Sequence, residues 1–121
     1  MTQDRLELGA WGEDQAVCYL KKQGLKIVAC NFRTPVGEVD IISRTRNELI
    51  FVEVKTRRSN AYGSPADAVG LRKQRQIIRT AQWYLNENKS SLQPRFDVIV
   101  VMPDSEGRAQ IEHLPGAFEL S

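Results

Sequence analysis

The chain has 121 residues, of which 41% are hydrophobic and 26% charged, and its formal net charge is +2. These values are typical of one globular domain over residues 1–121, which can bury roughly two-thirds of its unfolded surface. No apolar run approaches the ~20 residues of a membrane span, and the first residues lack the pattern of a signal peptide. We therefore expect a cytoplasmic protein with no membrane partner, in which Cys18 and Cys30 are buried, reduced thiols.

The first predicted element is a helix over residues 5–23, opened by a capping box of Asp4 and Glu7 and closed by Gly24. Apolar and small residues recur along one face of this helix at three- and four-residue spacing. Glu13 lies in the middle of that stripe, where a carboxylate is costly unless it is paired or binds a metal. Two interpretations follow: Glu13 belongs to a functional site, or it lies at the edge of the stripe and reaches solvent.

Three strands are predicted next. The first covers residues 25–33 and ends in a turn where Gly37 supplies an unusual backbone dihedral. The second and third cover residues 38–43 and 49–56. Both are rich in Val and Ile and are joined by a short polar turn, which indicates a hairpin.

The third of these strands has an unusual pattern. Side chains alternate between faces along a strand, so Ile50, Val52 and Val54 mark one face as core. The other face begins apolar and ends in Glu53 and Lys55. If the hairpin closes with its polar ends adjacent, Asp40 of the preceding strand joins these two side chains in one patch. Glu38 shares the face of Asp40, with either a metal-contacting or a salt-bridge role.

Such a patch suits phosphodiester chemistry. Mg²⁺ takes carboxylate oxygens and usually keeps waters and substrate phosphate oxygens as well. The ion can polarise a phosphodiester, while a lysine beside it orients the attacking water or neutralises charge on the phosphate. The alternative is an ordinary cross-strand salt bridge, worth a fraction of a kcal/mol. A Glu-X-Lys pattern alone is too short to decide between them.

Basic residues follow this patch. Between Lys55 and Arg79 the chain carries seven basic residues against a single acid. This excess suits a polyanion partner such as DNA, with Arg57, Arg58 and Lys73 as candidate phosphate contacts. The alternative is a solvated helix face and a basic loop. Tyr62 in that loop is either a base-stacking residue or a buried anchor.

A second helix is predicted from about residue 64 to residue 88, with Ser64 as N-cap and Pro65 at the first helical position. Lys73 falls on its apolar stripe, one turn before Ile77. Its side chain either bends toward the site or extends along the apolar surface to solvent.

Two strands complete the chain, over residues 95–101 and 109–114. The helical crossover predicts that the first of them runs parallel to the Glu53 strand. We expect Asp97 to accept hydrogen bonds or pair with an arginine, and His113 to be structural. Phe118 either folds back over the core or, with the last edge strand, supports a homodimer.

Asp40 followed by Glu53-Val54-Lys55 resembles the metal-binding signature of the PD-(D/E)XK nucleases, the restriction-endonuclease-like superfamily. More closely, residues 6–118 resemble the bacterial YraN-like family, a predicted relative of the archaeal Holliday junction resolvases. The matching segments are Asn31-Phe32-Arg33, Gly37-Glu38-Val39-Asp40-Ile41-Ile42, Phe51-Val52-Glu53-Val54-Lys55-Thr56-Arg57 and Arg95-Phe96-Asp97-Val98. One departure from the wider superfamily is that Val39, not proline, precedes Asp40. The resemblance also implies that an acidic residue of the first helix, here Glu13, lies at the metal site.

The sequence thus predicts an α/β fold of order αβββαββ, a restriction-endonuclease-like core with a mixed sheet flanked by helices. The leading functional hypothesis is a Mg²⁺- or Mn²⁺-dependent endonuclease acting on DNA, with branched or otherwise structured DNA as a candidate substrate. Asp40 and Glu53 would bind the metal, Glu13 would complete the site, and Lys55 would assist the nucleophile. One rival is a nucleic-acid-binding protein that keeps the fold without cleavage. The other is a metal-free scaffold with structural acids.

Overall fold

The fold is a mixed five-stranded sheet between two helices. The computed structural model describes residues 3–58 and 67–119, with side chains from residue 6 onward. In chain order its elements are α1 (Gln3–Lys22), β1 (Lys26–Thr34), β2 (Gly37–Arg44), β3 (Glu48–Thr56), α2 (Leu71–Glu87), β4 (Gln93–Pro103) and β5 (Ala109–Phe118). This order, αβββαββ, confirms the predicted α/β class and is consistent with a restriction-endonuclease-like core.

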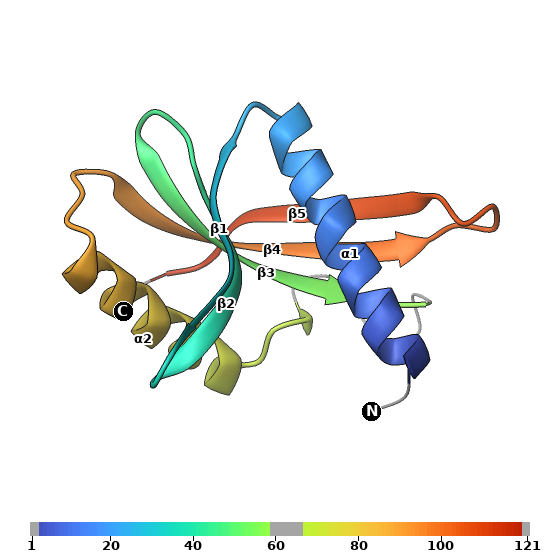
Figure 1. Cartoon of the computed structure of the whole chain (residues 1–121), viewed down its shortest axis with the longest axis horizontal. Coiled ribbons are helices and arrows are strands. Elements are labelled where there is room, and N and C mark those ends of the chain that lie inside the picture. The colour runs from blue at the N-terminus through green and yellow to red at the C-terminus, as the bar shows by residue number, and fades with distance from the viewer. Residues whose placement is uncertain (1–2, 59–66, 120–121) are drawn as a thin grey trace.

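The strands lie in the sheet in the order in which they occur in the chain. β1, β2 and β3 form an antiparallel meander, β3 and β4 are parallel, and β4 and β5 are antiparallel. The parallel pair is confirmed, since α2 carries the chain back to the end of the sheet at which β3 began (Figure 1). β1 and β5 are the two edges.

Each face of the sheet is covered by one helix, which gives the protein two cores. On the α1 side the buried residues are Ala16, Leu20, Ile41, Ile50, Val52, Ile99 and Val101. On the α2 side they include Val39, Ile42, Leu49, Phe51, Ile77, Ala81, Phe96 and Val98. Both faces of β3 therefore pack in a core. This explains why the face that ends in Glu53 and Lys55 begins with apolar residues.

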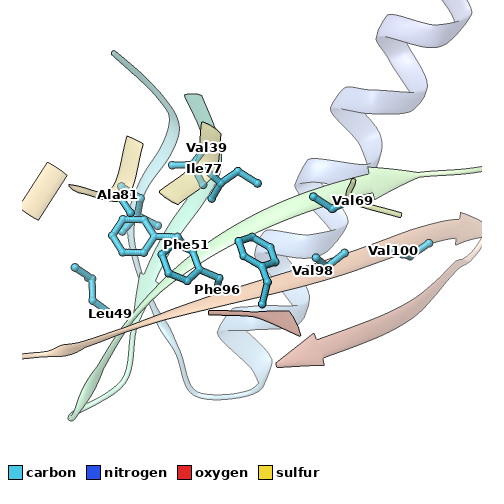
Figure 2. Close-up of a cluster of buried hydrophobic side chains, with 11 residues drawn as sticks. Val39, Leu49, Phe51, Val69, Ile77, Ala81, Phe96, Val98 and Val100 are labelled. Carbon is cyan, nitrogen blue, oxygen red and sulfur yellow. The ribbon is translucent and has the colours of Figure 1, made fainter. Parts of the chain in front are cut away.

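Aromatic rings dominate the core under α2 (Figure 2). Phe51 stacks on Phe96 with ring centroids 5.6 Å apart, and Phe96 stacks on Phe118 at 5.2 Å. Burial of each such ring stabilises the fold by about 1.5–3 kcal/mol. Phe118 thus folds back over the core, and β5 runs to Phe118, beyond the predicted end at residue 114.

The helix starts differ from the predictions. α1 begins at Gln3, so Asp4 is a helical residue and not the N-cap. α2 begins at Leu71, because Gly70 precedes it with an extended backbone at φ −74° and ψ 168° and acts as the N-cap. The predicted start at Ser64 and Pro65, and the loop residue Tyr62, lie outside the described residues.

The expectation that the cysteines are buried is wrong. Cys18 and Cys30 are both exposed free thiols. Cys18 lies on α1, at a surface hollow shared with the β4–β5 turn, and Cys30 lies on the edge strand β1. Across residues 3–58 and 67–119, neither helix is long and apolar enough to cross a membrane.

Candidate active site

The candidate site begins where β2 and β3 separate. Their pairing runs from Arg44 opposite Leu49 to Ile41 opposite Val52, and stops there. One residue further on, the Asp40 carboxylate replaces the ladder: its Oδ2 accepts the backbone N–H of Val54 at 2.7 Å. Beyond this point the two strands diverge, β2 toward α2 and β3 toward α1 (Figure 1). We call this point, between Asp40 on β2 and Glu53 to Lys55 on β3, the fork. Side chains from both faces of the sheet meet there.

Glu53 enters the fork from the face covered by α2. The residue is only 4% exposed, although it is a carboxylate next to two cationic side chains. Its Oε2 lies 3.9 Å from Lys55 Nζ, on the same strand, and 3.7 Å from Lys73 Nζ, in the first turn of α2. Of the two interpretations of Lys73, the structure favours the one in which the amine bends toward the site.

Glu13 enters from the opposite face, on α1. The helix packs tightly on β3 at this point, since a Cβ at Gly12 would overlap the Thr56 hydroxyl. This close approach places the Glu13 carboxylate beside Asp40, close enough for the two side chains to interact. Asp40 interacts in turn with Glu53. Asp40 therefore links two carboxylates that come from different layers of the molecule.

Asn31 is a site neighbour that sequence reasoning missed. It lies across from Asp40, between the paired residues Cys30–Ile41 and Phe32–Val39, and its side chain bonds to Glu13. Its φ of +52° makes it the one described non-glycine residue with a positive φ. Asparagine tolerates that conformation better than most residues, and such outliers cluster at functional sites. The only signal in the sequence was its place in the first segment of the family resemblance.

Crowding of the carboxylates changes their protonation. Burial, and then the hydrogen bond and charge of Asp40, raise the pKa of Glu53 to about 8, although Lys73 and Lys55 oppose the shift. Burial, followed by the charge of Asp40, also raises the pKa of Glu13, while Asn31 opposes it. Near neutral pH the fork therefore holds a proton that a cation of higher charge could displace.

The donor set suits a hard divalent cation in one particular way. Among the described residues, no group of three or more His, Cys, Asp or Glu side chains is arranged to hold a metal ion. Mg²⁺, however, is usually bound by one or two carboxylates, with waters and substrate phosphates completing its shell. The adjacent pair Asp40 and Glu53 meets that requirement, and Glu13 lies beside Asp40 rather than closing a three-ligand cage.

Comparisons with known proteins identify the family of this chain. Residues 12–101 match the model of the uncharacterised protein family UPF0102. The chain belongs to this family. A UPF0102 protein of Syntrophotalea carbinolica is 58% identical over 99% of this chain and 98% of its own length. Relatives from Desulfosudis oleivorans and Rhodococcus jostii are 44% and 46% identical, over 98% and 93% of this chain and 95% and 97% of their own lengths.

A groove in this family member adjoins the fork. It has a volume of about 950 Å³ and lies between the N-terminal half of α1 and the end of β3. Glu13 and Lys55 line it, and so do the predicted phosphate contacts Arg57 and Arg58. Six of the predicted site residues thus lie at the fork or along the groove, and Lys73 reaches the fork from α2. Glu38 instead forms an exposed ion pair with Arg33 at 3.2 Å.

A second polar cluster lies under α1, away from the fork. Asp97 is fully buried and receives two hydrogen bonds from Arg95, at 2.9 and 2.8 Å, and one from the Gly116 N–H at 3.0 Å. His113 Nε2 lies 2.7 Å from Asp97 Oδ2, and its Nδ1 lies 2.9 Å from the Tyr19 hydroxyl. The expected structural roles of Asp97 and His113 agree with this network, which joins α1 to β4 and β5.

Proposed function

We propose that the protein is a metal-dependent endonuclease that cleaves DNA phosphodiester bonds, with branched or structured DNA as its candidate substrate. The observation that carries the proposal is the meeting of Asp40, Glu53 and Glu13 with two lysines at the fork. Membership of the PD-(D/E)XK superfamily and kinship with junction resolvases are part of the same proposal. A cytoplasmic location follows from the DNA substrate.

The acids and amines have separate roles in this proposal. Asp40 and Glu53 would hold Mg²⁺ or Mn²⁺, and Glu13 would support Asp40. When bound, the ion would polarise the phosphodiester and stabilise the leaving oxygen. The Asp40 carboxylate is positioned in advance, because one of its oxygens is fixed by the Val54 N–H at 2.7 Å.

Two lysines serve the phosphate rather than the metal. Lys55 is 41% exposed and Lys73 32% exposed, so both amines reach solvent while remaining within 4 Å of Glu53. Their ammonium groups donate hydrogen bonds and neutralise charge that develops on a phosphate. Lys55 would orient the attacking water, and Lys73 would hold a phosphate oxygen at the fork.

The second candidate is a nucleic-acid-binding protein with this fold and no cleavage activity. The basic residues Lys55, Arg57 and Arg58 that line the groove favour it as much as they favour the nuclease. Carboxylates facing a phosphate repel it unless a cation lies between them, so a pure binder gains nothing from the acids of the fork. The presence of these acids beside two lysines therefore supports the nuclease proposal.

The test is cleavage of a panel of linear, nicked, flapped and four-way-junction DNAs, with Mg²⁺ or Mn²⁺ and with chelator. Glu53→Gln and Asp40→Asn should abolish cleavage and keep the fold, whereas Lys55→Ala should slow it by about 10²- to 10³-fold. Glu112→Gln, an exposed carboxylate on β5, is the matched control. Full activity in chelator, or in the Asp40 and Glu53 variants, would refute the assignment. Metal-independent binding without cleavage of any substrate would favour the second candidate.

A homodimer is the assembly we propose for junction cleavage. One site cuts one strand per encounter, and two-fold symmetry is the commonest way to hold two identical sites. Phe118 is buried in the core, so it is not available for a dimer contact. Of the surface predicted for the dimer, the open edge of β5 remains available to pair with a second copy of the chain. Light scattering with and without a four-way junction tests it. A monomer in both conditions would restrict the activity to nicking or flap cutting.

A further inference from the structure

The groove beside the fork has two chemically different walls. The α1 wall is apolar and is formed by Leu6, Leu8, Gly9 and Ala10, of which Leu6 is 54% exposed. The β3 wall carries Lys55, Arg57 and Arg58. An exposed leucine at the entrance of a basic groove is unusual, because phosphate contacts alone need no apolar surface.

The basic wall is held in place by the sheet. β3 pairs with β4 through Thr56 opposite Val101, and the Arg57 N–H then donates to the Val101 carbonyl at 2.9 Å. On the other side, the contact between Gly12 and Thr56 fixes the distance from α1 to β3. The two walls therefore face each other where α1 packs across the end of β3 (Figure 1). Glu13 and Lys55 line the groove and also belong to the fork.

The geometry points to a single-stranded nucleic acid segment as the occupant of this groove, with its phosphates on the β3 wall and its unstacked bases on the α1 wall. This inference rests on the proposed function and specifies its substrate. In a duplex the base faces are stacked inside, and only base edges and the sugar-phosphate backbone are exposed, so the apolar wall would find no base face to contact. A single strand presents phosphates on one side and base faces on the other, which matches both walls.

The consequence for the substrate is specific. The groove opens directly into the fork, so a strand lying in it would deliver its phosphodiester to Asp40 and Glu53. The preferred DNA would then carry an unpaired segment next to the scissile bond, as a flap or an overhang does. A fully paired linear duplex would be bound less well.

Binding in chelator tests the groove without requiring cleavage. The probes are a short fluorescein-labelled oligothymidylate, the blunt duplex of equal length, an oligouridylate of equal length, and polyglutamate as an acidic polypeptide. Fluorescence anisotropy should show either single strand binding about tenfold tighter than the duplex, and polyglutamate binding more weakly than both. The ratio of the two single strands shows which sugar the groove takes.

Two variants with matched controls assign the walls. Leu6→Gln should weaken single-strand binding by about tenfold and leave its salt dependence unchanged, whereas Arg58→Gln should flatten the salt slope by about 0.7. The controls are Val28→Gln, another exposed apolar residue, and Arg46→Gln, an exposed arginine in the β2–β3 turn. All four changes lie on the surface, so thermal unfolding should be unaffected.

Equal or tighter duplex binding, or a Leu6→Gln variant that behaves like Val28→Gln, would overturn the inference. So would polyglutamate binding as tight as that of the oligonucleotides. These outcomes can be distinguished from failure of the proposed function. Metal-dependent cleavage of paired DNA, with groove variants that bind as the wild type does, would refute only the single-strand inference. Single-strand binding without any cleavage would refute only the nuclease proposal.

Discussion

Asp97 and Glu53 are both buried carboxylates on neighbouring parallel strands, yet their surroundings are opposite. Asp97 is fully buried and is matched by a guanidinium, an imidazole and a backbone N–H. Glu53 is 4% exposed, interacts with the carboxyl group of Asp40, and lies 3.7 to 3.9 Å from two lysine amines. Burial opposes ionisation of both, but the hydrogen bonds of His113, Arg95 and Gly116 still lower the pKa of Asp97. The pKa of Glu53 rises to about 8.

The different surroundings of Asp97 and Glu53 indicate a structural role for the first and a functional role for the second. A buried acid whose donors are all supplied by the protein stabilises the fold and has no capacity left for a ligand. A buried acid placed against other acids costs stability, and its charge is only fully matched when a cation arrives. The two residues should therefore respond in opposite ways to mutation, to pH and to metal.

The largest expected effect is on stability at Asp97. Asp97→Ala removes the shared partner of Arg95 and His113, and should lower the free energy of unfolding by about 3 to 5 kcal/mol. Glu53→Gln instead replaces a buried carboxyl group next to another acid by a neutral amide of the same size, and should leave the free energy of unfolding equal or higher. Urea unfolding at neutral pH measures both. Similar losses in the two variants would show that Glu53 is a structural residue like Asp97.

Sequence alone predicted much of this arrangement. The hairpin and the alternation on β3 predicted one patch of Asp40, Glu53 and Lys55 if the polar ends of the hairpin lie adjacent, because the strand period fixes which side chains share a face. For Lys73 the sequence left two interpretations open. The α/β class and the parallel β3–β4 pair followed from element order. The family resemblance supplied the link from Glu13 on α1 to the site.

What could not be predicted depends on how elements approach each other. The fork arises where pairing of β2 and β3 stops, and no residue pattern marks that point. The role of Asn31 depends on its φ of +52°. The surroundings of Asp97 depend on the register shift in the β4–β5 pairing between Phe96 and Val98, where the Gly116 N–H donates to the carboxylate. Cys18 and Cys30 are exposed because none of the described residues covers the outer surface of α1 or the edge of β1 at these positions. Each is a tertiary property rather than a local one.

A second prediction uses pH. Glu53 is protonated in the folded protein and ionised in the unfolded chain between about pH 4.5 and about pH 8, so the folded state binds the extra proton. Stability should therefore fall as pH rises through that window, by at most about 1.4 kcal/mol for each pH unit. Asp97 acts in the opposite sense: its contribution is present above its ordinary value of 3.8 and is lost as pH falls below it.

Unfolding of the wild type, Glu53→Gln and Asp97→Asn across pH 3 to 8 would separate these contributions. The decline between about pH 4.5 and about 8 should be much smaller in Glu53→Gln, where only the raised pKa of Glu13 still contributes to it. It should also flatten in the wild type when Mg²⁺ is added, since the ion replaces the proton. The acid-side loss should shrink in Asp97→Asn alone. A decline of equal slope in the Glu53→Gln variant would assign the proton to another group.

The smallest expected effect concerns Glu13, the half-buried acid that lies between the two cases. Burial and the charge of Asp40 raise its pKa, but most of the side chain is screened by solvent. Glu13→Gln, which can still bond to Asn31, should raise the free energy of unfolding by only about a few tenths of a kcal/mol. Mg²⁺ affinity, measured by titration calorimetry, should fall because Asp40 loses a neighbouring negative charge. Glu112→Gln, at an exposed carboxylate on β5, should change neither quantity. A clear loss of stability with unchanged Mg²⁺ affinity would place Glu13 with Asp97, among the acids that hold the fold together.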